Sequence, residues 1–101
     1  MEVTRDEHRI QENAKITLSE QQVSCEFEDS RVILNFEDGM YYELDSVGAR
    51  LWDLIQEPRT FREVHRILLE EYDVDEERCR SDLESLFCDM ASQGLVMIED
   101  L

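Results

Sequence analysis

The change of periodicity within residues 39–52, GMYYELDSVGARLW, most constrains the fold of this chain. Up to Leu44 the residues are apolar and aromatic, as in a strand, whereas beyond it apolar residues recur at helical spacing. These helical positions are Val47, Leu51, Leu54 and Ile55. Asp45 or Ser46 can cap the free N–H groups of a first helical turn. The sequence therefore predicts a strand joined directly to a helix.

Two further extended runs precede this strand. In residues 15–27, KITLSEQQVSCEF, the alternation places Val23, Cys25 and Phe27 on one side, which predicts a half-buried strand. RVILNF follows with β-branched and aromatic residues. Asp38-Gly39 is a hairpin signal, because glycine accepts the positive φ of a tight turn. We expect a three-stranded antiparallel meander whose last strand, Met40–Leu44, lies at an edge.

Two more helices follow Pro58, which ends the first one. Thr60 and Glu63 have the spacing of a capping box at the start of the second helix. Its apolar stripe consists of Phe61, Val64, Ile67, Leu68 and Tyr72. The third helix is expected from about Asp75 to Gln93, and Gly94 stops it. Its apolar face consists of Cys79, Leu83, Leu86, Phe87 and Met90, and LVMI follows as a short extended tail.

The predicted fold class is α+β, with a three-stranded antiparallel sheet followed by three helices. A length of 101 residues suits one domain, and 42% hydrophobic residues suffice for one modest core. Residues 1–15 are polar and without period, which predicts an N-terminal tail that is mobile or orders only on a partner. Residues 16–101 are expected to form the domain.

The net charge of -16 restricts the possible partners. Such a field repels phosphate backbones and anionic lipids and attracts basic partners. The sequence has no apolar run long enough for a signal peptide or a membrane span. We therefore expect a cytoplasmic protein that binds neither nucleic acid nor a membrane.

Residues suited to catalysis or metal binding do not gather in the sequence. Cys25, Cys79 and Cys88 form no CxxC pair, and we interpret them as reduced apolar side chains. His8 and His65 are isolated, and paired acids such as Glu70-Glu71 and Glu76-Glu77 suit a solvated helix surface. We expect no enzyme activity and no cofactor.

The order of three strands and three helices is also that of a winged helix-turn-helix, whose recognition helix enters the DNA major groove. The third helix is acidic, however, with only Arg78 and Arg80 as bases. Its acids are Asp75, Glu76, Glu77, Asp82, Glu84 and Asp89. Laying this helix against phosphates would cost electrostatic energy. The shape is therefore compatible with the sequence, whereas DNA binding is disfavoured.

The edge strand Met40–Leu44 has two interpretations. Its open row of N–H and C=O groups is either shielded from aggregation or used to add an extended peptide to the sheet. Tyr41 and Tyr42 face opposite sides in any strand, so one ring is expected to pack inward as ordinary core. Leu83, Phe87 and Met90 are equally open to two interpretations, as core or as pocket side chains.

Three segments resemble the PqqD-like proteins, also called RiPP precursor peptide recognition elements. They are YYELDSVGARLWDLI, TFREVHRILLEEYDVD and DLESLFCDMASQGLV, and the likeness spans about Val23 to Ile98. Leu44, Asp45, Gly48 and Trp52 match the family pattern at the strand-to-helix joint, with aspartate in place of the usual asparagine. Asp82 and Gly94-Leu95 match the third-helix pattern. The family's Asp-Gly after the first helix is absent here, where Gln56-Glu57-Pro58 stands.

The resemblance implies a non-catalytic protein that binds the leader of a ribosomally made precursor peptide beside the third strand and the third helix. It implies delivery of that peptide to a modifying enzyme or a leader peptidase, and the wording of the joint favours lasso-peptide members. The expected peptide-binding residues are Met40, Tyr41, Tyr42, Glu43, Leu44, Arg80, Asp82, Leu83, Glu84, Phe87 and Met90. Proline at Tyr42 or Leu44 is expected to weaken binding.

Three alternatives stay open at this stage. The first is a winged-helix DNA-binding regulator. The second is a peptide chaperone for a radical SAM enzyme in pyrroloquinoline quinone formation. The third is a structural subunit whose edge strand pairs with a second copy.

Overall fold

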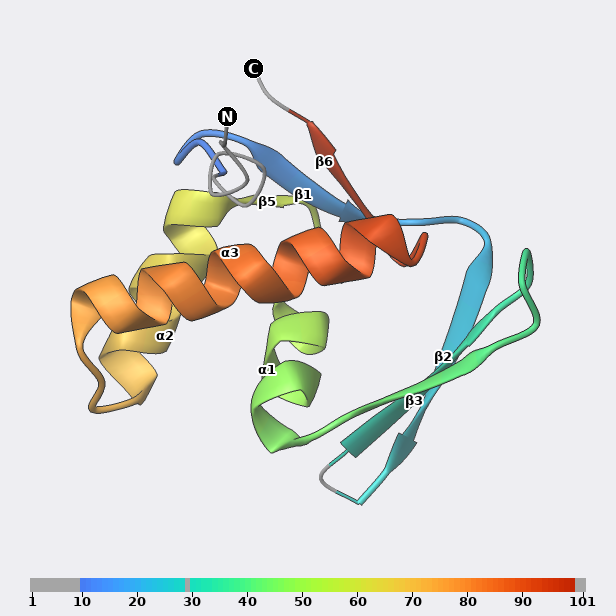
Figure 1. The fold of residues 1–101 in the computed structure, drawn as a ribbon. Coiled ribbons are helices and arrows are strands. Elements are labelled where there is room, and N and C mark those ends of the chain that lie inside the picture. The colour runs from blue at the N-terminus through green and yellow to red at the C-terminus, as the bar shows by residue number, and fades with distance from the viewer. Residues whose placement is uncertain (1–9, 29, 100–101) are drawn as a thin grey trace, which may run out of the picture.

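The computed structural model describes residues 10–28 and 30–99, which form two three-stranded antiparallel sheets and three helices (Figure 1). The strands are β1 (Lys15–Leu18), β2 (Gln22–Phe27), β3 (Ser30–Asn35), β4 (Tyr41–Leu44), β5 (Arg59–Thr60) and β6 (Val96–Glu99). The helices are α1 (Ser46–Leu54), α2 (Phe61–Glu71) and α3 (Glu76–Ser92). No helix in the described part of the chain is long and apolar enough to cross a bilayer.

The predicted meander is confirmed as the sheet β2-β3-β4, with β4 at its edge. The turn between β3 and β4 contains Gly39 at φ +68°, a conformation that glycine adopts without strain. The amide of Asn35 donates to the carbonyl of Met40 at 3.0 Å and closes the hairpin. Asp38 caps the turn by accepting from the amide of Met40 at 2.8 Å.

The second sheet, β5-β1-β6, was not predicted. Residues 15–18 were assigned to the first strand of the meander and residues 95–98 to a tail. Instead, β1 pairs with β6 along its whole length, from Lys15↔Glu99 to Leu18↔Val96, and with β5 on its other side. The prediction was wrong because these partners lie at opposite ends of the chain. Their pairing buries Ile16 completely, a gain that no local pattern reports.

The predicted inward face of β2 is not buried. Val23 is 52% exposed and Cys25 is exposed, whereas the side chain of Phe27 lies outside the described part. Ser24, opposite Ile33, is exposed as well, yet its hydroxyl accepts a hydrogen bond from Trp52 Nε1 at 3.0 Å. The indole N–H of the buried Trp52 thereby has the acceptor that it needs.

Helices α2 and α3 begin and end within one residue of the predicted positions, whereas α1 ends at Leu54, before the proline at 58 that was expected to end it. Asp45 caps α1 by accepting from the amide of Gly48 at 2.9 Å. Thr60 and Glu63 form both bonds of the predicted capping box on α2. Gly94 follows α3 at φ +80°, as expected for its stop. Local side-chain chemistry is thus sufficient to set these boundaries.

The core lies where the three helices meet both sheets. Its largest fully buried side chains are Trp52, Phe61, Phe87, Ile16, Ile33, Leu51, Ile55, Met90 and Leu95. The N-terminal arm, defined here as residues 10–14, also contributes, because Ile10 is 4% exposed and Ala14 is fully buried. The sequence assigned these residues to a polar tail. Residues 1–9 of that tail lie outside the described residues.

Candidate functional site

One side of β4 carries unpaired backbone groups. Asn35 and Met40 form a hydrogen-bonded pair, and such pairs alternate along an antiparallel ladder. Tyr42, opposite Ile33, and Leu44 therefore direct their N–H and C=O groups toward β3. Tyr41 and Glu43 direct theirs away from the sheet, where no described segment pairs with them.

The side chains of β4 divide between the two faces of the sheet. Tyr41 is 70% exposed, whereas Tyr42 and Leu44 are half-buried and pack against the core. The Tyr42 hydroxyl donates to Asp38 Oδ2 at 2.9 Å, and this bond to a carboxylate raises the pKa of Tyr42. One ring thus packs inward and its neighbour lies outside, as expected for adjacent strand residues.

An apolar groove of about 270 Å³ opens between α1 and α3. Helix α1 supplies one wall, α3 the other, and the end of α2 with the following loop closes one end. The lining residues are Val47, Leu51, Leu68, Tyr72, Val74, Arg78, Cys79, Asp82, Leu83 and Leu86. Of these lining residues, Val47 stands nearest in the chain to Leu44, the last residue of β4.

Two charged residues and a thiol mark the α3 wall of the groove. Arg78 and Asp82 are exposed and form a loose i,i+4 ion pair of 3.7 Å. Burial is the main cause that raises the pKa of Cys79, so this side chain is a neutral thiol at pH 7. The groove wall can therefore accept apolar side chains of a ligand, and the carboxylate of Asp82 at its rim can accept a hydrogen bond or an ion pair.

The structure separates the residues predicted for the third helix. Asp82 and Leu83 line the groove. Phe87 and Met90 are buried at 0% and 2% exposure and are not among the lining residues, whereas Leu83 lines the groove although it is only 3% exposed. On the opposite flank of α3 lie Arg80 and Glu84, which contact the N-terminal arm.

Sequence reasoning missed several lining residues. Val47 was assigned to the core face of α1, yet it is 44% exposed and lines the groove. Tyr72 and Val74, at the end of α2 and in the loop beyond it, are also partly exposed apolar side chains. Apolar residues in a short acidic loop are a signal for this groove that could have been used, because a solvated loop has no need of them.

Asn35 connects the β3–β4 hairpin to the end of α3. Its side chain is 2% exposed, donates from Nδ2 to the carbonyl of Gln93 at 2.7 Å and accepts from the amide of Glu37 at 2.9 Å. A Cβ on Gly94 would lie 3.1 Å from Asn35 Nδ2, so glycine permits this close approach. The position of the hairpin relative to α3 is therefore set by one buried amide.

Comparisons with known proteins agree on one family. The family model "Coenzyme PQQ synthesis protein D (PqqD)" matches residues 30–96. The solved structure described as "TbiB1 in Complex with the TbiA(beta) Leader Peptide" is 31% identical, with a TM-score of 0.76 over 79% of this chain and 93% of that chain. Among curated protein sequences no match was found.

A second solved structure, "Lasso peptide synthetase B1 complexed with the leader peptide", shares the fold at 18% identity. Its TM-score is 0.73 over 81% of this chain and 96% of that chain. The family model spans about two thirds of this chain and includes β3, β4 and all three helices. The chain therefore belongs to the PqqD family.

Proposed function

We propose that this chain binds the leader region of a ribosomally synthesised precursor peptide, which adds as an antiparallel strand to β4. The open backbone groups of Tyr41 and Glu43 carry the proposal, because they offer main-chain hydrogen bonds at a sheet edge. The apolar groove beside α3 would receive anchoring side chains of the peptide. Both solved relatives are described as complexes with leader peptides.

In this proposal the chain performs no chemistry itself. It presents the bound precursor to a modifying enzyme or a leader peptidase in the cytoplasm. Lasso-peptide formation is favoured because one solved structure of the same fold is described as a lasso peptide synthetase B1 with its leader peptide. A winged-helix-like arrangement of the sheet and the three helices would serve here to bind a peptide. The acidic surface of α3 makes duplex DNA an unfavourable ligand.

Calorimetric titration tests the proposal directly. Two synthetic peptides are suitable probes, the TbiA(beta) leader and the leader half of any short precursor encoded next to this chain. We expect one-to-one binding of at least one of them in the micromolar range or tighter, that is, about -8 kcal/mol or more favourable. Absence of heat and of any fluorescence change of Trp52 with both peptides would refute it.

Val47→Glu provides a test of the groove. Val47 is partly exposed at the second position of α1, where a carboxylate suits the helix dipole and the fold should persist. A charge in the apolar groove should weaken peptide binding by about 1 to 3 kcal/mol, measured by calorimetry. Met97→Glu on β6 is the matched control, because Met97 has nearly the same exposure on the other sheet. Equal affinities of both variants would exclude the groove.

A further inference from the structure

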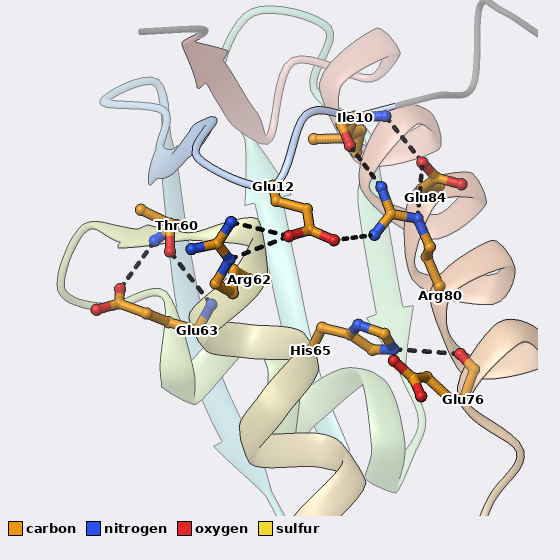
Figure 2. Close-up of polar contacts among 9 residues, drawn as sticks. All are labelled: Ile10, Glu12, Thr60, Arg62, Glu63, His65, Glu76, Arg80 and Glu84. Carbon is orange, nitrogen blue, oxygen red and sulfur yellow. Dashed lines mark hydrogen bonds and ion pairs between the residues drawn. The ribbon is translucent and has the colours of Figure 1, made fainter.

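The N-terminal arm, residues 10–14, lies across α2 and α3, and the carboxylate of Glu12 in this arm binds a residue of each helix (Figure 2). Glu12 Oε1 accepts from Arg62 Nε at 3.0 Å and lies 2.9 Å from Arg62 Nη2. Its other oxygen, Oε2, accepts from Arg80 Nη1 at 3.0 Å. One side chain of the arm thus bridges a guanidinium on α2 and a guanidinium on α3.

Main-chain contacts of the arm repeat this connection. The amide of Ile10 donates to Glu84 Oε2 at 2.9 Å, and its carbonyl accepts from Arg80 Nη2 at 3.3 Å. On the α2 side, the amide of Arg62 donates to the carbonyl of Glu12 at 2.9 Å. The arm therefore contacts both helices through side chains and backbone, far in sequence from either.

Helix α3 has the arm on one flank and the groove on the other. Arg80 and Glu84 face the arm, whereas Asp82 and Leu86, each two residues further along the helix, line the groove. Residues two apart on an α-helix point to nearly opposite sides. A shift of α3 away from the arm therefore changes the width of the groove.

Charge explains why Glu12 is needed for this placement. Arg62 and Arg80 both lie within hydrogen-bond distance of the same carboxylate. Arg80 Nε also lies 3.8 Å from Glu84 Oε2 on its own helix, but Glu12 is the carboxylate that the two arginines share between α2 and α3. Its loss would therefore leave the repulsion between the two cations less compensated. The Arg80 guanidinium also lies 5.3 Å from the centroid of the Phe61 ring, so its movement would disturb the junction of α2 and α3.

We propose that Glu12 is a positioning residue for peptide binding, which holds α3 against α2 and so keeps the groove between α3 and α1 in its binding shape. The proposal rests on the proposed function for the peptide. The two arginines that Glu12 binds, Arg62 and Arg80, do not line the groove. It lies on the opposite flank of that helix, so its effect would pass through the helix position.

The first test compares Glu12→Gln with Glu20→Gln. Each variant loses one exposed carboxylate, but within residues 10–28 and 30–99 the side chain of Glu20 forms no ion pair or hydrogen bond, whereas Glu12 contacts both arginines. Calorimetry with the two leader peptides named above should show an affinity loss of about fivefold for Glu12→Gln, the upper end for exposed charge pairs. Glu20→Gln should bind as the unchanged protein does. Equal affinity of the two variants would overturn the proposal.

The second test needs no peptide and uses Cys79, which lines the groove. In a Cys25→Ser, Cys88→Ala background, N-ethylmaleimide labels only this thiol. We expect Glu12→Gln to raise the labelling rate by about fivefold. This is the same factor as in the first test, because the loss of the same contacts shifts α3 in both. In about 0.5 M salt the background protein should approach that faster rate, because salt screens the Glu12 contacts.

The two tests separate this proposal from the proposed function. If the unchanged protein binds neither peptide, the proposed function fails, and the labelling rates still decide whether Glu12 holds α3. Labelling at the same rate with and without Glu12 overturns the positioning role. Faster labelling with undiminished peptide affinity overturns the connection between that role and binding.

Discussion

Glu43→Pro is expected to weaken leader binding by about tenfold to a hundredfold while the protein stays folded. The N–H of Glu43 points away from the sheet, so the fold loses no hydrogen bond when proline replaces it. A peptide strand would lose one main-chain donor and would meet the proline ring at the edge, which costs about 1 to 3 kcal/mol. Calorimetry measures the affinity, and far-UV circular dichroism checks the fold.

Glu43→Ala is the matched control, because it removes the same side chain and keeps the N–H. Its affinity should stay within about threefold of the original, since an exposed charge contributes little.

Tyr42→Pro should instead unfold part of the hairpin, because the N–H of Tyr42 points toward β3. This corrects the expectation that proline at Tyr42 or Leu44 tests the docking edge. Tight binding by folded Glu43→Pro would exclude strand addition at β4.

Asn35→Leu should lower the free energy of unfolding by about 2 to 3 kcal/mol. The substitution removes the buried side-chain amide that bonds the carbonyl of Gln93 and the amide of Glu37, at two partly buried hydrogen bonds. It also brings a branched side chain against Gly94, which approaches Asn35 closely. For a domain of this size the melting temperature should fall by roughly 10 to 20 °C. Urea unfolding followed by Trp52 fluorescence measures the loss.

Asn13→Ala is the control for this prediction, because Asn13 is exposed in the arm and its loss should change stability by less than about 0.5 kcal/mol. Asn35→Asp adds a sharper comparison. It keeps an acceptor for the amide of Glu37 but sets an oxygen against the carbonyl of Gln93, so it should lose nearly as much as Asn35→Leu. Stability of Asn35→Leu equal to that of Asn13→Ala would show that the amide does not hold the hairpin to α3.

Helix boundaries were predictable because their causes are local. Asp45, the Thr60–Glu63 capping box and Gly94 each act within three or four residues along the chain. The Asp38-Gly39 turn and the edge position of β4 were predictable for the same reason. The resemblance to the family also rested on these local segments.

The site was predictable only in part. Glu43 and Asp82 were named from the sequence, but nothing in the sequence distinguished Leu83 in the groove from Phe87 in the core. Both lie on the apolar face of α3 and both are buried, at 3% and 0% exposure, but only Leu83 also lines the groove. Glu84 was expected to meet a peptide, yet the arm from the other end of the sequence occupies it.

The sequence by itself determined the helices, their caps, the meander and the acidic character that disfavours nucleic acid. Only the tertiary structure decided the second sheet, the hydrogen bond between Ser24 and Trp52, and the placement of Asn35 and Glu12. Each of these depends on partners distant in the chain, such as β6 for β1 and Trp52 for Ser24. Burial and hydrogen-bond satisfaction are properties of the assembled core, and periodicity along a segment records neither of them.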